Sequence, residues 1–381
     1  MIHKFLLRFS GFAAAFTALL PLNATAYDCA NECPNQFCLD VDYLYWQIQD
    51  SPKIIPLVIE QPLVDGPFTV VLGGKKITND WHSGAKISLG YWFDTFERLG
   101  VEGSYFFLGE NSKSSSFTSN ANGSPRLRVP YFNVTTGLPD STALATPGLY
   151  QGSAILKTSD WMQGAELNIV KEICPINFTT FKVLAGFRYW NLDDNLKFSA
   201  NSPLISPPSV YFNQDKFNTQ NNFYGGQIGA SFNQCFLSSF FVDIKGKVAL
   251  GAMCQQSTIK GYFQTNEFTG SVETFEGGYF ALPTNIGNRS QTCFAVIPEL
   301  NLNIGCQITD CLSIHVGYTA LYVSNVLRAS KQMSSDVNPT QSANIEFTPT
   351  PVLVGAPSPQ AKFKSSSLWI QGVNAGLDYI F

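Results

Sequence analysis

Few side chains in this sequence are of the types and spacings that usually support catalysis. Asp80 and His82 lie two residues apart in Asp80-Trp81-His82, and Ser313 lies two residues before His315. An Asp–His pair could activate water for hydrolysis, and a Ser–His pair could supply a nucleophile. Such i, i+2 pairs arise often by chance, and catalysis also needs a third group that orients the base. We therefore expect polar residues without a catalytic role, no enzymatic activity and no cofactor.

Cysteines offer a second kind of chemistry, because exported chains often form disulfides. The sequence has nine, which are Cys29, Cys33, Cys38, Cys174, Cys235, Cys254, Cys293, Cys306 and Cys311. All nine are disulfide candidates, either within the chain or to neighbouring proteins, and an odd total leaves at least one thiol free or intermolecular. Cys254 and Cys293 flank a long connection and could pair across its neck. The spacing Cys29-x3-Cys33-x4-Cys38 misses the usual zinc pattern and has no nearby His, so we expect no metal site.

Away from the strand ends, ionised side chains occur on only one face of the segments in which apolar residues alternate. Nine of them are predicted to line an enclosed lumen: Lys86, Glu102, Glu166, Lys182, Arg188, Asp243, Lys245, Lys247 and Glu299. A Lys or Arg that faces lipid costs about 2–4 kcal/mol at the bilayer midplane, and this penalty would produce such a split. In a water-filled pore, opposed charges would set an ion preference. In a narrow barrel filled by side chains, the same charges would instead be paired ions.

The elements that position these residues are ten segments with an apolar period of two. They run roughly over 38–48, 84–94, 98–108, 161–172, 178–190, 222–233, 239–253, 293–304, 311–323 and 367–381. Short connections (95–97, 173–177, 234–238 and 305–310) alternate with long ones (49–83, 109–160, 191–221, 254–292 and 324–366). This pattern predicts an all-β chain that forms one antiparallel transmembrane β-barrel over 38–381, with short periplasmic turns and long extracellular loops.

The number of strands is expected to be about ten. Segments 127–134 and 258–264 could add a hairpin, which leaves twelve or more strands open. A soluble β-sandwich also alternates, but its outward faces should contain more Lys, Glu and Thr than these segments do.

Composition agrees with a barrel that faces lipid. Charged residues are 14% of the chain, against about 25% in a typical soluble domain. Aromatic residues are also 14%. No stretch after residue 26 approaches the ~20 apolar residues of a helical membrane span. The small net charge of -4 argues against nucleic acid as a partner.

The N-terminal residues predict export. Lys4 and Arg8 precede an apolar run from Phe12 to Leu22, and Ala24-Thr25-Ala26 offers a small-x-small cleavage site. These are the parts of a signal peptide, which we place at 1–26. A cysteine-rich periplasmic segment would follow at 27–37. The predicted location is the bacterial outer membrane.

The C-terminal residues GVNAGLDYIF alternate up to a terminal aromatic residue. Their alternate positions are Val373, Ala375, Leu377, Tyr379 and Phe381. A last strand that pairs with the first strand needs no polar tail, because pairing closes the barrel and removes its free edges. The series resembles the C-terminal assembly signal of Gram-negative outer-membrane proteins. That resemblance implies two partners, outer-membrane lipid and the outer-membrane assembly machinery.

Several strands resemble those of the major outer membrane protein family of Legionella and chlamydia-like bacteria. The similar stretches are DVDYLYW (Asp40 to Trp46), GAKISLGYWF, LGVEGSYFFLG, GFRYWNL at 186–192 and the terminal GLDYIF. The resemblance implies a porin-like protein that allows passive diffusion of small polar solutes or ions.

Two other functions are weighed against diffusion. The first is a structural or adhesive surface protein. Envelope cross-linking in the chlamydial relatives implies that its periplasmic-side cysteines would join it to copies of itself or to cysteine-rich envelope proteins. The second is a barrel protease, because Asp80 and His82 are similar to the acidic and Asp-x-His groups at the external rim of omptin-type barrels.

Overall fold

The computed structural model describes residues 37–62, 67–94, 99–176, 179–206, 209–236, 239–266, 271–346 and 352–381. The expected signal peptide at 1–26 lies outside the described residues, as does the expected cysteine-rich segment at 27–37 apart from Phe37. Among the described residues, no helix has both the length and the apolar composition that a membrane-crossing helix requires.

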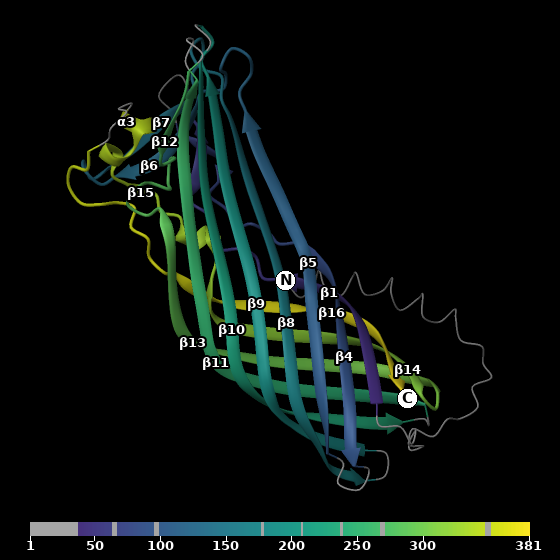
Figure 1. Cartoon of the computed structure of the whole chain (residues 1–381). Helices are drawn as coiled ribbons and strands as arrows, with labels where there is room; N and C mark the ends of the chain where they lie inside the picture. Colours follow the sequence, from purple (N-terminus) through teal and green to yellow (C-terminus); the bar gives the residue numbers. More distant parts are fainter. Residues whose placement is uncertain are drawn as a thin grey trace.

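Ten antiparallel strands form a closed barrel, as predicted from the alternation (Figure 1). They are β1 (Phe37–Ile48), β4 (Trp81–Asp94), β5 (Leu99–Thr118), β8 (Ser153–Ile176), β9 (Thr179–Pro203), β10 (Val210–Phe236), β11 (Phe240–Asn266), β13 (Gly287–Thr309), β14 (Leu312–Leu327) and β16 (Ser365–Ile380). The last strand pairs with the first from Cys38↔Ile380 to Ile48↔Ile370. This pairing closes the sheet into a cylinder, so the predicted ten-stranded all-β barrel is confirmed.

The period-two pattern sorts side chains between the two faces of the barrel wall. On β10, Ile228 is 68% exposed on the outer face, whereas Phe223 and Gln227 are 0% and 3% exposed on the inner face. Aromatic pairs lie around the outer face, about midway along β9 and β10 but near one end of the shorter strands β1, β4 and β16. Tyr45 stacks on Trp81 with ring centroids 4.8 Å apart. Tyr189 lies beside Tyr224, and Tyr322 beside Trp369. Such a belt marks a membrane–water interface.

The strands on one side of the barrel continue well beyond this aromatic belt. β8, β9, β10 and β11 contain 24, 25, 27 and 27 residues, whereas crossing a bilayer takes about 9–11. Much of the predicted long loops is therefore strand, including 191–203 and 254–266. The alternation of apolar residues ends at the belt, because the outer face beyond the lipid no longer needs apolar residues.

The two ends of the barrel differ, and we name them by their connections. At the turn end, short connections join β4 to β5, β8 to β9, β10 to β11 and β13 to β14, as predicted, although β8 and β13 continue to Ile176 and Thr309, beyond their expected ends at 172 and 304. The C-terminus also lies at this end (Figure 1). At the opposite end, the long connections fold into a compact unit that we call the cap.

The cap is built around a second, smaller sheet. Its strands are β2 (Pro56–Glu60), β3 (Thr69–Gly73), β6 (Leu127–Asn133), β7 (Leu138–Ala145) and β15 (Asp336–Val337). The helical turns are α2 (Ala329–Gln332), η2 (Pro339–Gln341) and α3 (Ala343–Glu346), and β12 (Val272–Glu276) pairs with β11. Of the segments considered as an extra hairpin, 127–133 is β6 of the cap and 258–264 is part of β11. Neither adds a strand to the barrel.

The cap packs into the mouth of the barrel. Its buried side chains include Leu57, Leu127 and Phe280, which belong to one cluster with Phe198 and Phe217 of the barrel wall. All five are 0% exposed. Burying large apolar side chains of this kind contributes about 1.5–3 kcal/mol each, so the cap and the wall stabilise each other.

A buried carboxylate fastens one cap segment, 277–282, to β10. The Asp215 carboxylate accepts hydrogen bonds from the backbone N–H groups of Tyr279, Phe280 and Ala281, at 3.2, 3.2 and 2.8 Å. A Cβ on Gly278 would lie 2.3 Å from Asp215 Oδ1, so only glycine allows this approach. Burial also raises the pKa of the Tyr279 hydroxyl, which stays neutral at physiological pH.

Candidate functional site

Four of the predicted lumen charges form one buried cluster, which we call the tetrad. It contains Glu166 of β8, Arg188 of β9, Lys247 of β11 and Glu299 of β13. Arg188 contacts both glutamates, and Lys247 Nζ lies 2.9 Å from Glu166 Oε1 and 2.9 Å from Glu299 Oε1. The four side chains are only 3–10% exposed. Two acids and two bases cancel, so the tetrad joins four strands through neutralised charge.

The other predicted lumen charges lie nearer the turn end and are more exposed. Lys245 Nζ is 3.4 Å from Glu102, and these side chains are 24% and 27% exposed. Lys86 is 3.7 Å from Asp42 and is also 27% exposed. Lys182 lies over the ring of Trp92, with Nζ 4.9 Å from the ring centroid.

Asp243, the last of the predicted set, pairs in register with Asn303 on β13. All nine predicted residues thus lie on the inner face. The alternation located them but could not show which of them pair.

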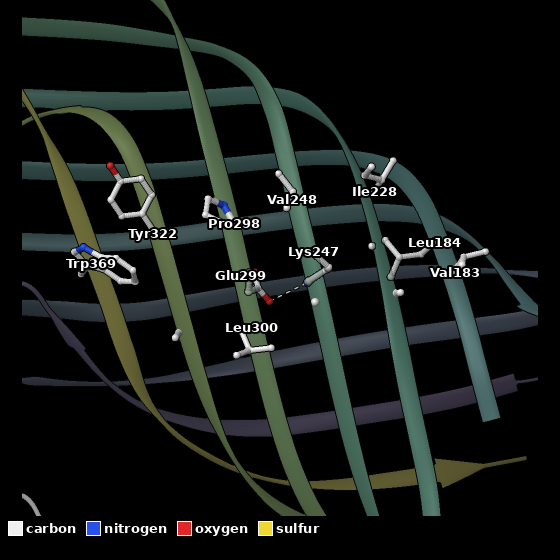
Figure 2. Close-up of a pocket in the computed structure, with 14 residues that line it drawn as sticks. Val183, Leu184, Ile228, Lys247, Val248, Pro298, Glu299, Leu300, Tyr322 and Trp369 are labelled. Carbon is white, nitrogen blue, oxygen red and sulfur yellow. Dashed lines mark ion pairs between the residues drawn. The ribbon is translucent and has the colours of Figure 1, made fainter. Parts of the chain in front are cut away.

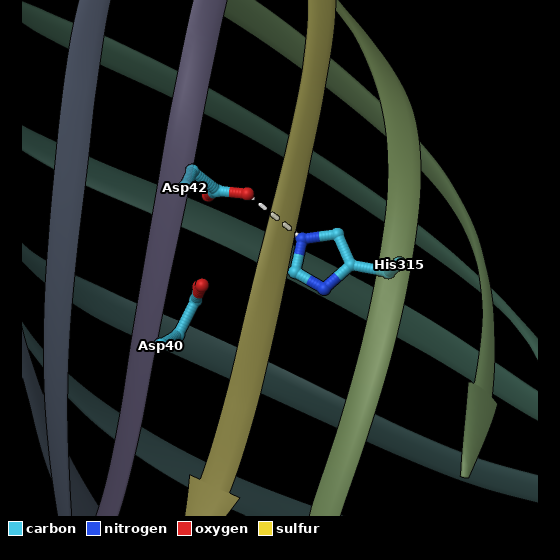
Figure 3. A group of neighbouring side chains, drawn as sticks. All are labelled: Asp40, Asp42 and His315. Carbon is cyan, nitrogen blue, oxygen red and sulfur yellow. Dashed lines mark hydrogen bonds and ion pairs between the residues drawn. The ribbon is translucent and has the colours of Figure 1, made fainter. Parts of the chain in front are cut away.

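Next to Lys86, His315 lies between two carboxylates. Its Nε2 is 2.8 Å from Asp42 and its Nδ1 is 2.9 Å from Asp378 (Figure 3 shows the Asp42 contact). Asp40, Asp42 and His315 are close enough to suggest metal ligands. However, a carboxylate only accepts hydrogen bonds, so both ring nitrogens must donate and neither keeps a lone pair for a metal. The cluster fits a hydrogen-bonded ion network better than a metal site.

An apolar layer fills the lumen on the cap side of the tetrad. Its members come from β1, β5, β8, β9, β10, β11, β13, β14 and β16. They include Trp190 at 1% exposure and Phe223 and Ile297 at 0%. In the described part of the chain, the lumen therefore holds partly exposed charges, then the tetrad, then this apolar layer, then the core of the cap. Such stacking leaves little room for water to cross.

A groove of about 870 Å³ lies on the outer wall where β13 and β14 separate (Figure 2). These strands pair from Thr309↔Leu312 up to Glu299↔Leu321, and beyond that point β13 continues with β11. Ile228 and Trp369, exposed by 68% and 52%, form part of the rim. The ion pair of Lys247 with Glu299 lies at its inner side. The groove is mainly apolar and opens on the outer face of the barrel.

The members of the two pairs that the sequence analysis weighed as catalytic candidates make their side-chain contacts with other residues. Asp80 is exposed and pairs with Lys113 at 2.8 Å, rather than with His82. His82 is 2% exposed and lies 3.0 Å from Asp160 of β8. The Ser313 hydroxyl donates to Asp378 at 3.1 Å, and His315 contacts the same carboxylate. Ser313 therefore does not face the histidine as a nucleophile would.

Asp160 belongs to a buried network beneath the cap that the sequence did not predict. Arg328, 2% exposed, donates to Asp194 of β9 at 2.5 Å and to the Ser51 hydroxyl at 2.6 Å. Its guanidinium also lies 3.9 Å from Asp160. Arg328 lies in a connection expected to be an irregular loop. A lone Arg flanked by apolar Val326, Leu327 and Ala329 was the available signal.

The described cysteines divide between the turn end and the barrel wall. Cys311 is disulfide-bonded, and Cys306 Sγ lies 3.6 Å from the Gln307 carbonyl oxygen. Cys38 carries a free thiol beside Gly90, in the lumen. Cys235 is near the end of β10. The candidates Cys29 and Cys33, and the side chain of Cys174, lie outside the described part of the structure.

The possible disulfide between Cys254 and Cys293 is not formed. Cys293 is directly opposite Met253 and joins the apolar layer on the inner face, whereas Cys254 is opposite Thr292 on the outer face. Both are free thiols. The sequence misled because these residues lie within the extended β11 and β13, not at the neck of a loop.

The C-terminal residues expected to act as an assembly signal lie on β16 and just past its end. Leu377, Tyr379 and Phe381 are exposed on the outer face by 52%, 42% and 48%. Val373 is in register with Tyr45 of β1 and with Tyr318 of β14. The series thus combines a lipid-facing surface with the pairing that closes the barrel.

Comparisons with solved structures found matches of low overall similarity. The outer membrane protease OmpT of Escherichia coli aligns over 93% of this chain and 100% of its own, with a TM-score of 0.45 and 10% identity. The toluene transporter TodX of P. putida aligns over 93% and 91%, with a TM-score of 0.21 and 8% identity. A FadL homologue of Pseudomonas aeruginosa aligns over 91% and 91%, with a TM-score of 0.25 and 7% identity.

A comparison with curated proteins found no match. A family model described as "Putative beta barrel porin-7 (BBP7)" matches residues 39–381, which span the whole barrel and the cap. The chain therefore belongs to the BBP7 family of porin-like β-barrels.

Proposed function

We propose that this protein is a closed, porin-like barrel of the bacterial outer membrane whose working part is the cap, in a structural or adhesive surface role. The turn end would face the periplasm and the cap the exterior. This proposal rests on one observation: the tetrad, the apolar layer and the core of the cap fill the lumen. The proposal includes no catalytic step, since His82 is buried and hydrogen-bonded beneath the cap.

The electrostatics of the lumen support a closed state over a conducting one. Opposed charges select ions when they face water across a pore. In the tetrad, the acids and bases bond directly to each other. An ion that entered would have to break these contacts and then cross side chains such as Trp190 without hydration, which is costly in a low-dielectric layer.

Single-channel recording tests this proposal. The refolded protein, inserted in planar bilayers in KCl, is expected to show no steady conductance steps. Folding is verified separately by the faster gel mobility of the unheated barrel, and a trimeric porin refolded and inserted in the same way serves as the positive control. Stable channels from every inserted molecule would contradict a closed lumen.

Passive diffusion of small polar solutes or ions is the second candidate. It is favoured by membership of a porin-like family and by the charges nearer the turn end, such as Lys86 and Lys245, whose side chains are 27% and 24% exposed. The resemblance of the strands to the major outer membrane proteins of Legionella and chlamydia-like bacteria points the same way. This function requires the apolar layer to move, and it predicts the channels that the closed barrel lacks.

The proposed surface role includes covalent partners at the turn end. Export through a signal peptide would place the cysteines there in an oxidising compartment. The partners would be further copies of this chain or cysteine-rich envelope proteins. In native envelopes, non-reducing electrophoresis is then expected to show the mature chain in larger species that collapse to the monomer on reduction. Migration as a monomer under both conditions would remove cross-linking from the proposal.

A further inference from the structure

Four lysines lie in one row across the tall wall of the barrel. Lys157 of β8 is directly opposite Lys197 of β9, which is directly opposite Lys216 of β10, which is directly opposite Lys260 of β11. All four are exposed. We call this row the lysine ladder. Neighbouring strands are about 4.8 Å apart, so the ladder places four positive charges along about 14 Å.

The surroundings of the ladder leave its charge uncompensated. The row below is neutral and polar: Ser159, Asn195, Asn218 and Thr258. The nearest acid in register is Glu276, which lies opposite Tyr262 and therefore diagonal to Lys260. Among the described residues, the ion pairs within 4.0 Å include none of the four lysines.

Such an arrangement opposes folding rather than aiding it. Like charges directly opposite each other on an antiparallel pair are destabilising, and the ladder repeats this contact at three strand pairs. Solubility alone would be served by lysines in any register. Neutral side chains with hydroxyl and amide groups beside aligned ammonium groups suit an extended ligand that carries repeated anions and sugar hydroxyls.

The position of the ladder indicates where its ligand would lie relative to the membrane and the barrel wall. Lys197 and Lys216 lie eight residues from the aromatic belt at Tyr189 and Tyr224 (197 − 189 and 224 − 216). That is about 26 Å along the strand, or about 20 Å above the belt at the usual strand tilt. The side chains project sideways from the wall, on the face opposite the lumen. The lysines can therefore contact molecules that surround the barrel in the membrane plane.

We propose that the lysine ladder binds the acidic glycan of outer-leaflet glycolipids, through the phosphate and carboxylate groups of its sugars. The ligand would run along the row, with one anionic group near each ammonium group and with sugar hydroxyls bonded to the neutral row below. This binding would relieve the repulsion among the lysines and hold an ordered glycolipid against the tall wall.

The test compares two variants with equal change of charge. In the ladder variant, Lys157, Lys197, Lys216 and Lys260 are replaced by Gln. In the control variant, four exposed lysines outside the ladder are replaced by Gln: Lys53, Lys75, Lys76 and Lys362. Binding of purified lipopolysaccharide to the folded protein in detergent is measured at several salt concentrations, together with binding of the same material after enzymatic dephosphorylation.

Wild type and the control variant are expected to bind lipopolysaccharide alike. Each lysine near an anionic surface contributes about fivefold in affinity, so the ladder variant should bind at least about 100-fold more weakly and with a flatter salt dependence. Dephosphorylated material should bind wild type more weakly. Because the substitutions remove repulsion, the ladder variant should fold at least as stably as wild type. If it does not fold, the pairwise variants K157Q/K197Q and K216Q/K260Q give the same comparison.

Equal losses in the ladder and control variants would overturn the proposal, because they would show an effect of net charge alone. Binding that changes neither with salt concentration nor with dephosphorylation would also overturn it. The proposal would also be wrong if the ladder bound soluble sulfated polysaccharide but not lipopolysaccharide. That result would indicate a partner outside the membrane.

Discussion

Replacing Arg188 with methionine is expected to lower the free energy of unfolding by about 3–5 kcal/mol. The guanidinium lies between Glu166 and Glu299, and its removal leaves two buried carboxylates with only Lys247 to balance them. Methionine keeps most of the side-chain volume, so the loss reports charge rather than packing. Denaturant unfolding in detergent, followed by tryptophan fluorescence and by gel mobility, measures the change.

Two further variants make this result specific to the buried charges. Lys245→Met removes a base whose pair with Glu102 is 24% and 27% exposed, so it should cost less than about 1 kcal/mol. Arg188→Met combined with Glu299→Gln leaves one acid and one base, and it should regain much of the lost stability. A loss below about 1 kcal/mol for Arg188→Met alone would show that water reaches the tetrad, and the closed lumen would then be wrong.

Replacing Asp215 with alanine is expected to release the cap segment 277–282 while leaving the barrel folded. Three backbone N–H groups, those of Tyr279, Phe280 and Ala281, lose their acceptor in a buried site. Each unsatisfied buried donor costs about 1–3 kcal/mol. The free energy of local opening of this segment should then fall by roughly 3 kcal/mol. Amide hydrogen exchange in the segment should therefore become about 100-fold faster. Exchange measured by mass spectrometry on the folded protein tests this.

Asp215→Asn is the matched control, because it keeps one acceptor oxygen in place and should give a smaller increase. Exchange at the turn end, for example in β14, should not change in either variant. If segment 277–282 exchanged at the wild-type rate in Asp215→Ala, the apolar contacts of Phe280 would be sufficient to hold the cap, and the carboxylate would be unnecessary.

The sequence predicted the lipid-facing part of this molecule well, because lipid imposes a strict rule. Every second residue must be apolar, and segments such as 178–190 and 239–253 obey the rule, so strand positions and inner charges followed from it. Beyond the aromatic belt, water meets the outer face and the rule lapses. Lys197, Ser199 and Asn201 then resemble loop residues although they belong to β9.

The pairing of side chains could not be predicted for a different reason. Alternation places Glu166, Arg188 and Glu299 on the inner face. Glu166 and Arg188 then meet through the register of β8 with β9, but the contact of Arg188 with Glu299 of β13 depends on how the barrel closes. The lysine ladder needed the same information, since its four members are spread over 104 residues (260 − 157 + 1) and align only through register. Arg328 was missed because a single cation in a predicted loop gives no sign of burial.

The hairpin of β10 and β11 keeps one unbroken register from Val210↔Asn266 to Phe236↔Phe240. A load applied where these strands meet the cap would act along both strands in the same direction. It would strain in parallel the many hydrogen bonds that join the hairpin to β9 and β13, instead of opening them one after another. The hairpin would behave as a stiff rod anchored in the bilayer. Tension on the exterior would reach the inner side of the membrane with little loss, as an attachment point under shear requires.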